Sequence, residues 1–138
     1  MDETGRTDAM PQFDYTVRTA KSVDEATAAV EAALTARNFR VQMVHDVQAT
    51  LAEKGFEREP IRIVETCNAK YAYQVLEADV SIALMLPCPI AVYDKDGETF
   101  ISSLKPSAIG SFYPHAGIDD VAQEVEGILL AAVDEAAR

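Results

Sequence analysis

The sequence contains no tryptophan, two cysteines and two histidines, and few basic residues for its 138 positions. Its 12 Lys and Arg stand against 23 Asp and Glu, which gives a formal net charge of −11. Binding to a phosphate backbone needs clustered basic side chains, so this charge argues against a nucleic-acid partner. No apolar run approaches the roughly 20 residues that span a bilayer, and anionic membrane surfaces repel an acidic protein. We therefore expect neither nucleic acid nor a membrane among the partners.

The N-terminal residues 1–11 are polar and lack the basic and apolar regions of a secretory signal. We expect them to form a disordered leader, and residues 12–138 to form a single domain, because one hydrophobic core suffices at this length. The expected compartment is the cytoplasm. In that reducing environment the two cysteines should be free thiols, and two alone cannot complete a four-ligand zinc site.

Familiar catalytic motifs are also missing. The sequence has no Gly-x-Ser-x-Gly nucleophile elbow, no His-Glu-x-x-His pair and no phosphate-binding loop of the Walker type. Known hydrolase and NTPase mechanisms therefore lack their residues. Because no catalytic set is recognised, the sequence favours a non-enzymatic protein and leaves any activity undefined.

Alternating apolar and polar side chains predict strands at residues 13–18, 39–44 and 60–65. The second of these strands should place Phe39, Val41 and Met43 on one face. The strongest local signal is a hairpin at residues 90–104, in which two strands are joined by a tight turn that ends at Gly97. The sequence thus predicts five strands.

Helical spacing of apolar residues, together with capping residues, predicts four helices. They are residues 23–37 after Ser22, residues 47–54 after Asp46, residues 69–78 after Asn68, and a C-terminal helix capped by Asp119 or Asp120. Residues 80–86 should form a loop or a turn of helix. Residues 106–117 are expected to be an extended loop, because Pro, Gly and Ser interrupt any period.

These elements predict an α+β fold with a largely antiparallel sheet of about five strands and helices packed on one face. A doubly wound parallel sheet is the alternative. The hairpin and the absence of a Gly-rich phosphate loop after any strand weigh against it.

Several short motifs resemble a known family: Phe39-x-Val41, Asp46-Val47, Lys54-Gly55, Cys67-Asn68-x-Lys70-x-Ala72-Tyr73, Leu86-Pro87-Cys88 and Val92-Tyr93. Over about residues 13–106 they are similar to domain of unknown function family number 302. The resemblance implies a small α+β domain, often dimeric, with no established reaction. Ala69 and Pro89 stand where the family commonly has Pro and Asn.

The two cysteines are the main candidates for chemistry. Cys67 lies where a predicted strand passes into a helix, and the positive end of that helix should stabilise a thiolate and lower its pKa. Cys88 lies between two prolines where the hairpin begins. The alternative for both is a small buried thiol chosen for its size. If the two junctions are neighbours, they could hold Cu(I), Zn(II), a haem iron or a redox disulfide.

Cys67 and Cys88 are the candidate metal ligands, and four further residues could contribute to binding a ligand. Asn68 and Tyr71 adjoin the first junction, while His45 with Asp46 ends a predicted strand and could supply a partner for a thiol. We expect a small binding domain that holds a metal, haem or other small ligand near Cys67 and Cys88. The alternatives are a structural or homodimeric assembly module without a ligand and a thiol-based redox protein. The sequence does not identify the cofactor.

Overall fold

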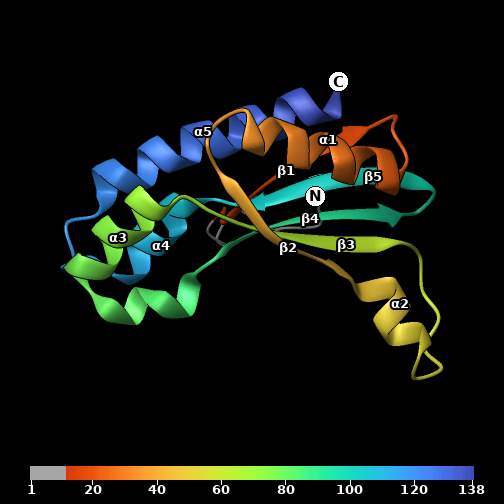
Figure 1. The fold of residues 1–138 in the computed structure, drawn as a ribbon, viewed down its shortest axis with the longest axis horizontal. Helices are drawn as coiled ribbons and strands as arrows, with labels where there is room; N and C mark the ends of the chain where they lie inside the picture. The colour runs from red at the N-terminus through yellow and green to blue at the C-terminus, as the bar shows by residue number, and fades with distance from the viewer. Residues whose placement is uncertain (1–11) are drawn as a thin grey trace.

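Five antiparallel strands form the sheet of the computed structural model, which describes residues 12–138 (Figure 1). The strands are β1 (Asp14–Thr19), β2 (Arg40–Asp46), β3 (Ile61–Cys67), β4 (Cys88–Lys95) and β5 (Glu98–Leu104). Their order is β1-β5-β4-β3-β2, and every neighbouring pair is antiparallel. The predicted α+β class with a five-stranded antiparallel sheet is confirmed. The disordered leader predicted at residues 1–11 lies outside the described residues.

The two longest helices, α1 (Val23–Thr35) and α5 (Asp119–Ala137), pack against each other on one face of the sheet (Figure 1). α1 begins at the predicted capping box. The Glu25 N–H donates to Ser22 Oγ (3.1 Å), and the Ser22 N–H donates to Glu25 Oε1 (3.0 Å). Beneath the two helices the sheet supplies the centre of the core, which includes Val64, Ile90, Val92 and Ile101.

The other face of the sheet is only half-buried. Side chains alternate along a strand, so Ile63, Ala91, Tyr93 and Phe100 point away from α1 and α5. The rings of Tyr93 and Phe100 stack with centroids 5.9 Å apart. Their strands, β4 and β5, form the predicted hairpin, whose turn ends at Gly97 with φ at 79°. This face therefore has an apolar centre with polar and charged side chains around it, and it is partly open to solvent.

Three short helices gather at the end of the sheet where β3 finishes and β4 begins (Figure 1). They are α3 (Ala69–Ala78), the 3-10 helix η1 (Val80–Met85) and α4 (Pro106–Phe112). α3 agrees with the helix predicted after Asn68, and η1 agrees with one of the two alternatives predicted for residues 80–86, a loop or a turn of helix. Around these helices a second, smaller buried cluster forms from Ile82, Ile109 and Ile118.

α4 occupies residues 106–112 of the extended loop predicted for residues 106–117, so the prediction was wrong there, while residues 113–117 have no regular structure. Pro106 occupies a position in the first turn, where the missing N–H costs no helical hydrogen bond. Ile109 is buried, and Gly110 allows a close approach to α5, because a Cβ there would lie 2.8 Å from Asp119 Oδ1. Packing against α5 therefore stabilises a helix whose sequence has little helical periodicity.

β2 also departs from the prediction. A register shift between Val41 and Met43 turns Met43 to solvent, where it is 53% exposed, instead of placing it on the face of Val41. The strand continues through His45 to Asp46, where we expected a break. Asp46 nevertheless caps the next helix, α2 (Val47–Ala52), as predicted.

The start of α5 differs by a few residues from the prediction. Ile118 is the N-cap residue, without a side-chain hydrogen bond, so Asp119 and Asp120 lie in the first turn and do not cap the helix. Their carboxylates still face the positive end of the helix dipole. No helix in residues 12–138, including the 19-residue α5, is long and apolar enough to cross a membrane.

Candidate ligand pocket at Cys67 and Cys88

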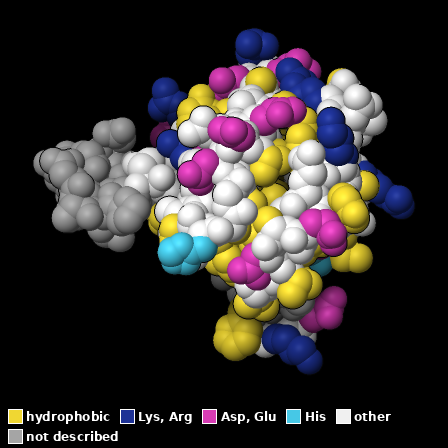
Figure 2. All heavy atoms as spheres, turned by 90° about the vertical axis from the view of Figure 1, so that its left-hand side faces the viewer, with side chains coloured by type: hydrophobic (Ala, Val, Ile, Leu, Met, Phe, Trp, Pro, Cys, Tyr) yellow, Lys and Arg dark blue, Asp and Glu magenta, His cyan; other side chains and the backbone are white. Residues whose placement is uncertain are grey.

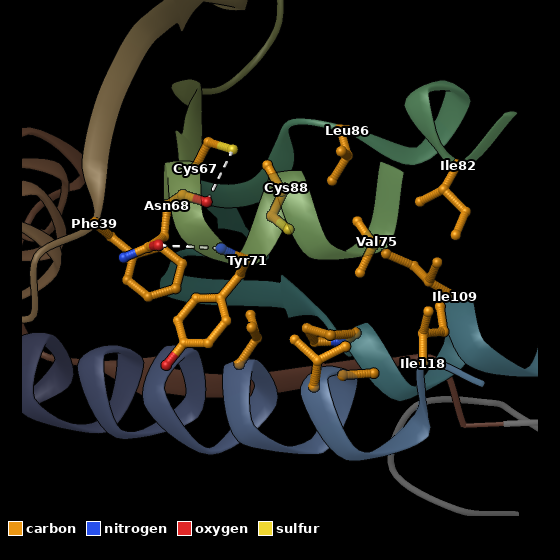
Figure 3. A pocket seen from close by; sticks show the side chains of 15 residues that line it. Phe39, Cys67, Asn68, Tyr71, Val75, Ile82, Leu86, Cys88, Ile109 and Ile118 are labelled. Atoms are coloured by element: carbon orange, nitrogen blue, oxygen red, sulfur yellow. Dashed lines mark hydrogen bonds between the residues drawn. The ribbon is translucent and has the colours of Figure 1, made fainter. Parts of the chain in front are cut away.

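A cavity of about 50 Å³ opens among α3, η1, α4 and α5 at the end of the sheet (Figure 3). Most of its wall is apolar and comes from Phe39, Tyr71, Ala72, Val75, Ile82, Leu86, Pro106, Ile109, Ile118, Val121, Ala122 and Val125. Cys67, Asn68 and Cys88 complete the lining. The wall thus offers apolar surface, two thiols and one carboxamide, and none of these lining residues is charged.

The helices around this pocket carry several large apolar side chains on their outer surface. Tyr73, Val80, Leu84 and Phe112 are between 65% and 84% exposed. They lie on α3, η1 and α4, the elements at the end of the molecule that faces the viewer in Figure 2. That view shows hydrophobic side chains at the surface between acidic ones.

The topology of the sheet places the two cysteines at the same end of the sheet. β3 and β4 are antiparallel neighbours in which Thr66 lies directly opposite Cys88. Cys67 is the last residue of β3 and Cys88 the first of β4, so both lie at one end of the sheet. α3 and η1 carry the chain from one strand to the other. The two junctions that the sequence singled out therefore line the same pocket.

Cys88 is the more deeply placed of the two thiols. Its side chain is buried, and Figure 3 shows its sulfur directed toward the cavity. Burial, with a smaller contribution from the charge that Cys67 can carry, raises the pKa of Cys88 from 9.0 to about 11. Cys88 is therefore a protonated thiol at neutral pH.

Cys67 does not have the lowered pKa that the sequence predicted. Partial burial raises the pKa of its thiol above the ordinary value, and the Asn68 backbone offsets this only in part. Its Sγ atom donates to the Asn68 carbonyl oxygen at 3.9 Å. The N-terminus of α3 is occupied by Asn68 Oδ1, which accepts from the N–H groups of Lys70 (3.0 Å) and Tyr71 (3.3 Å). These backbone N–H groups therefore donate to the Asn68 side chain and not to the Cys67 thiol.

Asn68 and Tyr71 hold α3 against its surroundings at the pocket. Asn68 Nδ2 donates to the Asn38 carbonyl oxygen at 3.0 Å. The Tyr71 ring stacks on Phe39 with centroids 6.1 Å apart, and its hydroxyl donates to Glu124 Oε2. This hydrogen bond raises the pKa of Tyr71. Tyr71 thus links α3 to α5 beside the cavity.

The comparison with protein families assigns the chain. The family model "Domain of unknown function DUF302" matches residues 15–136. The chain belongs to the DUF302 family. A crystal structure of an uncharacterized conserved DUF302 protein from Bacillus stearothermophilus is similar to this fold, with a TM-score of 0.86 and 29% sequence identity. That similarity covers 93% of this chain and 100% of the other. Comparison with curated proteins finds no match.

The remaining two candidate residues lie elsewhere in this DUF302 chain. Arg40 pairs with Cys67 at the first end of β2, whereas His45 and Asp46 lie at the last end of that strand. They are therefore far along the strand from Cys67. His45 Nε2 lies 3.3 Å from Glu65 Oε1, and Asp46 caps α2. Neither lines the pocket. Within residues 12–138, no three His, Cys, Asp or Glu side chains are grouped so that they could hold a metal ion.

Sequence reasoning missed part of the apolar wall. Val121 and Val125 belong to the predicted apolar face of the last helix, and Val75 to that of α3, so periodicity marked them as core without assigning them to a site. Ile109 stands on the helix that was predicted to be a loop. The signal that could have located the wall was the set of apolar residues in that supposed loop.

Proposed function

We propose that this DUF302 domain binds a small ligand in the pocket at Cys67 and Cys88. The observation that carries the proposal is the convergence of both cysteines of the chain on one apolar cavity. Strand ends, short helices and α5 all contribute to its wall, as is common for ligand sites formed between packed elements.

Two small side chains help to keep the cavity open. Ala72 and Ala122 line this space, and larger apolar residues at either position would reduce it. Small residues around a cavity support a role in binding.

The size of the cavity favours a metal ion or the apolar end of a small molecule over haem. A space of about 50 Å³ accommodates a few water-sized groups, whereas a haem macrocycle would require the surrounding helices to separate. Neither His45 nor His115 is among the lining residues, so these positions supply no axial imidazole. Haem therefore has the weakest support among the ligands that the sequence suggested.

The state of the thiols supports binding over thiol catalysis. A nucleophilic or redox cysteine reacts as the thiolate, and both thiols here have raised pKa values. The helix N-terminus beside Cys67 is occupied by the Asn68 side chain. A redox role thus lacks the activated thiolate on which it would depend.

The proposal is tested by protecting the thiols with ligands. Purified protein is labelled with a maleimide dye at pH 8 in the presence of Cu(I), Zn(II), hemin, or a panel of small apolar probes such as indole. We expect at least one of these probes to slow the labelling of Cys67 and to raise the melting temperature. Complete labelling at an unchanged rate with every probe would contradict ligand binding at this pocket.

A pair of variants separates occupancy of the cavity from general effects. Ala72→Leu adds an apolar side chain at the wall, while Ala78→Leu places the same side chain at the exposed end of the same helix. Protection by a probe should fall in Ala72→Leu and persist in Ala78→Leu. Equal protection in the two variants would place the ligand outside the cavity.

We also propose a homodimer formed through the open face, which we define as the half-buried sheet surface around Ile63, Ala91, Tyr93 and Phe100. Two contacts between polar groups lie on this face, since His45 Nε2 is 3.3 Å from Glu65 Oε1 and Arg18 Nη1 is 2.7 Å from Glu98 Oε1. A chain with a net charge of −11 repels its copies over most of its surface, and a face whose centre is apolar reduces that repulsion. Symmetric contact of one face with itself is the commonest way for soluble proteins to dimerise.

Light scattering at micromolar concentration tests the homodimer. We expect the mass of a dimer for the natural chain and of a monomer for Ala91→Glu, which places a charge in the open face. Ala131→Glu, on the exposed surface of α5, is the matched control and should remain dimeric. A monomeric natural chain would eliminate this second proposal.

A further inference from the structure

We infer that the ligand of this pocket inserts a short, unbranched aliphatic chain, as a short-chain primary alcohol carries, and leaves its polar head in solvent. This inference rests on the proposed binding function and names the chemical class of its ligand. Three features of the cavity carry it: the hydrogen bonding of its polar groups, its volume and its shape.

Apart from the Cys88 thiol, each polar side chain in the wall already has a partner within the protein. Both ends of the Asn68 carboxamide are used, since Oδ1 accepts from two backbone N–H groups of α3 and Nδ2 donates to a backbone carbonyl oxygen. The Tyr71 hydroxyl donates to Glu124, and the Cys67 thiol donates to the Asn68 carbonyl oxygen. A polar group that is buried without a hydrogen bond costs free energy. The part of the ligand inside the cavity should therefore be hydrocarbon.

The two cysteines do not present a pair of thiols to a metal ion. Cys88 lies opposite Thr66 on the same face of the sheet, whereas side chains alternate along β3, so Cys67 points to the other face. Figure 3 shows the Cys88 sulfur directed toward the cavity and the Cys67 sulfur directed at the Asn68 carbonyl. The cavity thus faces one thiol, which behaves as a small apolar group when it is protonated and buried.

The volume of the cavity favours a narrow chain over a ring. An aliphatic cavity of about 150 Å³ holds a benzene molecule, whereas this one has about 50 Å³. One water-sized group needs about 10 to 15 Å³ of such space, so the cavity takes about three to five of them. A methylene group is similar in size to a water molecule. A chain of about three to five carbon atoms therefore fits without movement of the surrounding helices.

The wall is also elongated. Figure 3 shows Phe39 and Tyr71 at one end of the lining side chains and Ile82 and Ile109 at the other, with Cys88 between them. α3 supplies the wall on one side of this row and α5 on the other. A linear chain that lies along the row contacts apolar side chains over its whole length.

The experiment titrates the isotope-labelled protein with primary alcohols from ethanol to octanol and obtains each Kd from the NMR shifts of amides in the pocket wall. Affinity should rise about fourfold with each carbon atom, which is the gain from burying one methylene group. The rise should end at about five carbon atoms, when the cavity is full. Indole should bind more weakly than pentanol because its rings exceed the available space. Tighter binding of indole than of every alcohol would overturn the inference.

Two substitutions in the wall should move the end of this rise in opposite directions. Ala72→Leu fills part of the cavity, so affinity should stop rising at shorter alcohols, while Ile109→Val enlarges it and should extend the rise by about one carbon atom. Ala78→Leu, at the exposed end of α3, is the matched control and should leave the series unchanged. Circular dichroism checks that each variant is folded, and the conservative Ile109→Val carries the test if Ala72→Leu is not. An unchanged series in every folded wall variant would contradict the inference.

The outcomes separate this inference from the proposed binding function. If affinity does not depend on chain length while Cu(I), Zn(II), hemin or indole protects Cys67 from the maleimide dye, the inference falls and the binding function stands. If no probe, the alcohols included, protects Cys67 or shifts the amides of the pocket, both fall.

Discussion

At the scale of single residues, burial decides the chemistry of the pocket. The same loss of solvent that makes Cys88 part of the main core disfavours its charged form, and so does a charge on the neighbouring Cys67. A protonated thiol is a poor nucleophile. The buried Cys88 thiol is therefore poorly reactive toward electrophiles at neutral pH.

The raised pKa of Cys88 predicts a loss of stability at alkaline pH. In the unfolded chain the thiol loses its proton near 9.0, and in the folded chain near 11, so the unfolded state binds fewer protons between these values. The free energy of unfolding therefore falls as pH rises from about 9 to about 11, by up to about 3 kcal/mol at 1.36 kcal/mol per pKa unit.

Urea unfolding of the natural chain and of Cys88→Ala between pH 7 and pH 10.5 measures this effect. The variant is less stable at pH 7 because a buried side chain is truncated, but it has no thiol to titrate at this position. The difference in unfolding free energy between the two proteins should narrow above pH 9. A difference that stays constant across this range would contradict the raised pKa of Cys88.

The residue-level predictions from sequence succeeded where chain neighbours determine the outcome. Asn68 caps α3 because its side chain precedes the first turn, and this is visible in the local sequence. The predicted low pKa of Cys67 failed because that same cap occupies the helix N–H groups. His45 was considered as a partner for a thiol, but the antiparallel pairing of β2 with β3 places it away from the pocket, and pairing register is not encoded locally.

At the scale of elements, α3 covers one side of the cavity and is the least buried of its walls. None of the residues of α3 is fully buried. Its attachments near the pocket include the Asn68 contact with Asn38, the stacking of Tyr71 on Phe39 and the hydrogen bond from Tyr71 to Glu124. An element with few buried apolar contacts opens locally at a lower free energy than the core does.

Tyr71→Phe should increase this local opening. The substitution removes the hydrogen bond to Glu124 and retains the ring that stacks on Phe39, so it weakens the attachment of α3 to α5 without changing the stacking. Native-state hydrogen exchange should show lower protection in α3 and unchanged protection in β4. Tyr73→Phe is the control, because Tyr73 is 65% exposed on the same helix. Equal exchange of α3 in the two variants would mean that the bond to Glu124 does not hold the helix.

The elements that the sequence predicted best are those with strong local signals. The capping box at Ser22 and the Gly97 turn of the hairpin require only neighbouring residues. α4 was missed because Pro106 and Gly110 are typical of loops, and its helical form depends on packing against α5. The bulge in β2 was missed because an added residue in one strand is defined by its partner strand. Tertiary contacts therefore account for both errors.

At the scale of the whole molecule, the charge of −11 opposes the compact state. Acidic residues exceed basic ones, so the basic side chains cannot neutralise the acidic ones even if every one of them is paired. Surface ion pairs such as Arg37 with Glu135 contribute little individually. Repulsion among the excess carboxylates should therefore outweigh the attraction of the pairs at low ionic strength.

This balance predicts that NaCl stabilises the protein at pH 7. Raising NaCl from 10 mM to 500 mM shortens the Debye length from about 30 Å to a few Å and screens the net repulsion. A gain of about 1 kcal/mol would raise the melting temperature by roughly 3 to 5 °C for a chain of this size. Calorimetry at pH 7 measures the shift, and the same titration near pH 4.5, the sequence pI, is the control because net repulsion vanishes there. If NaCl instead lowers the melting temperature at pH 7, paired charges dominate, and the excess of carboxylates is not what limits the stability of the fold.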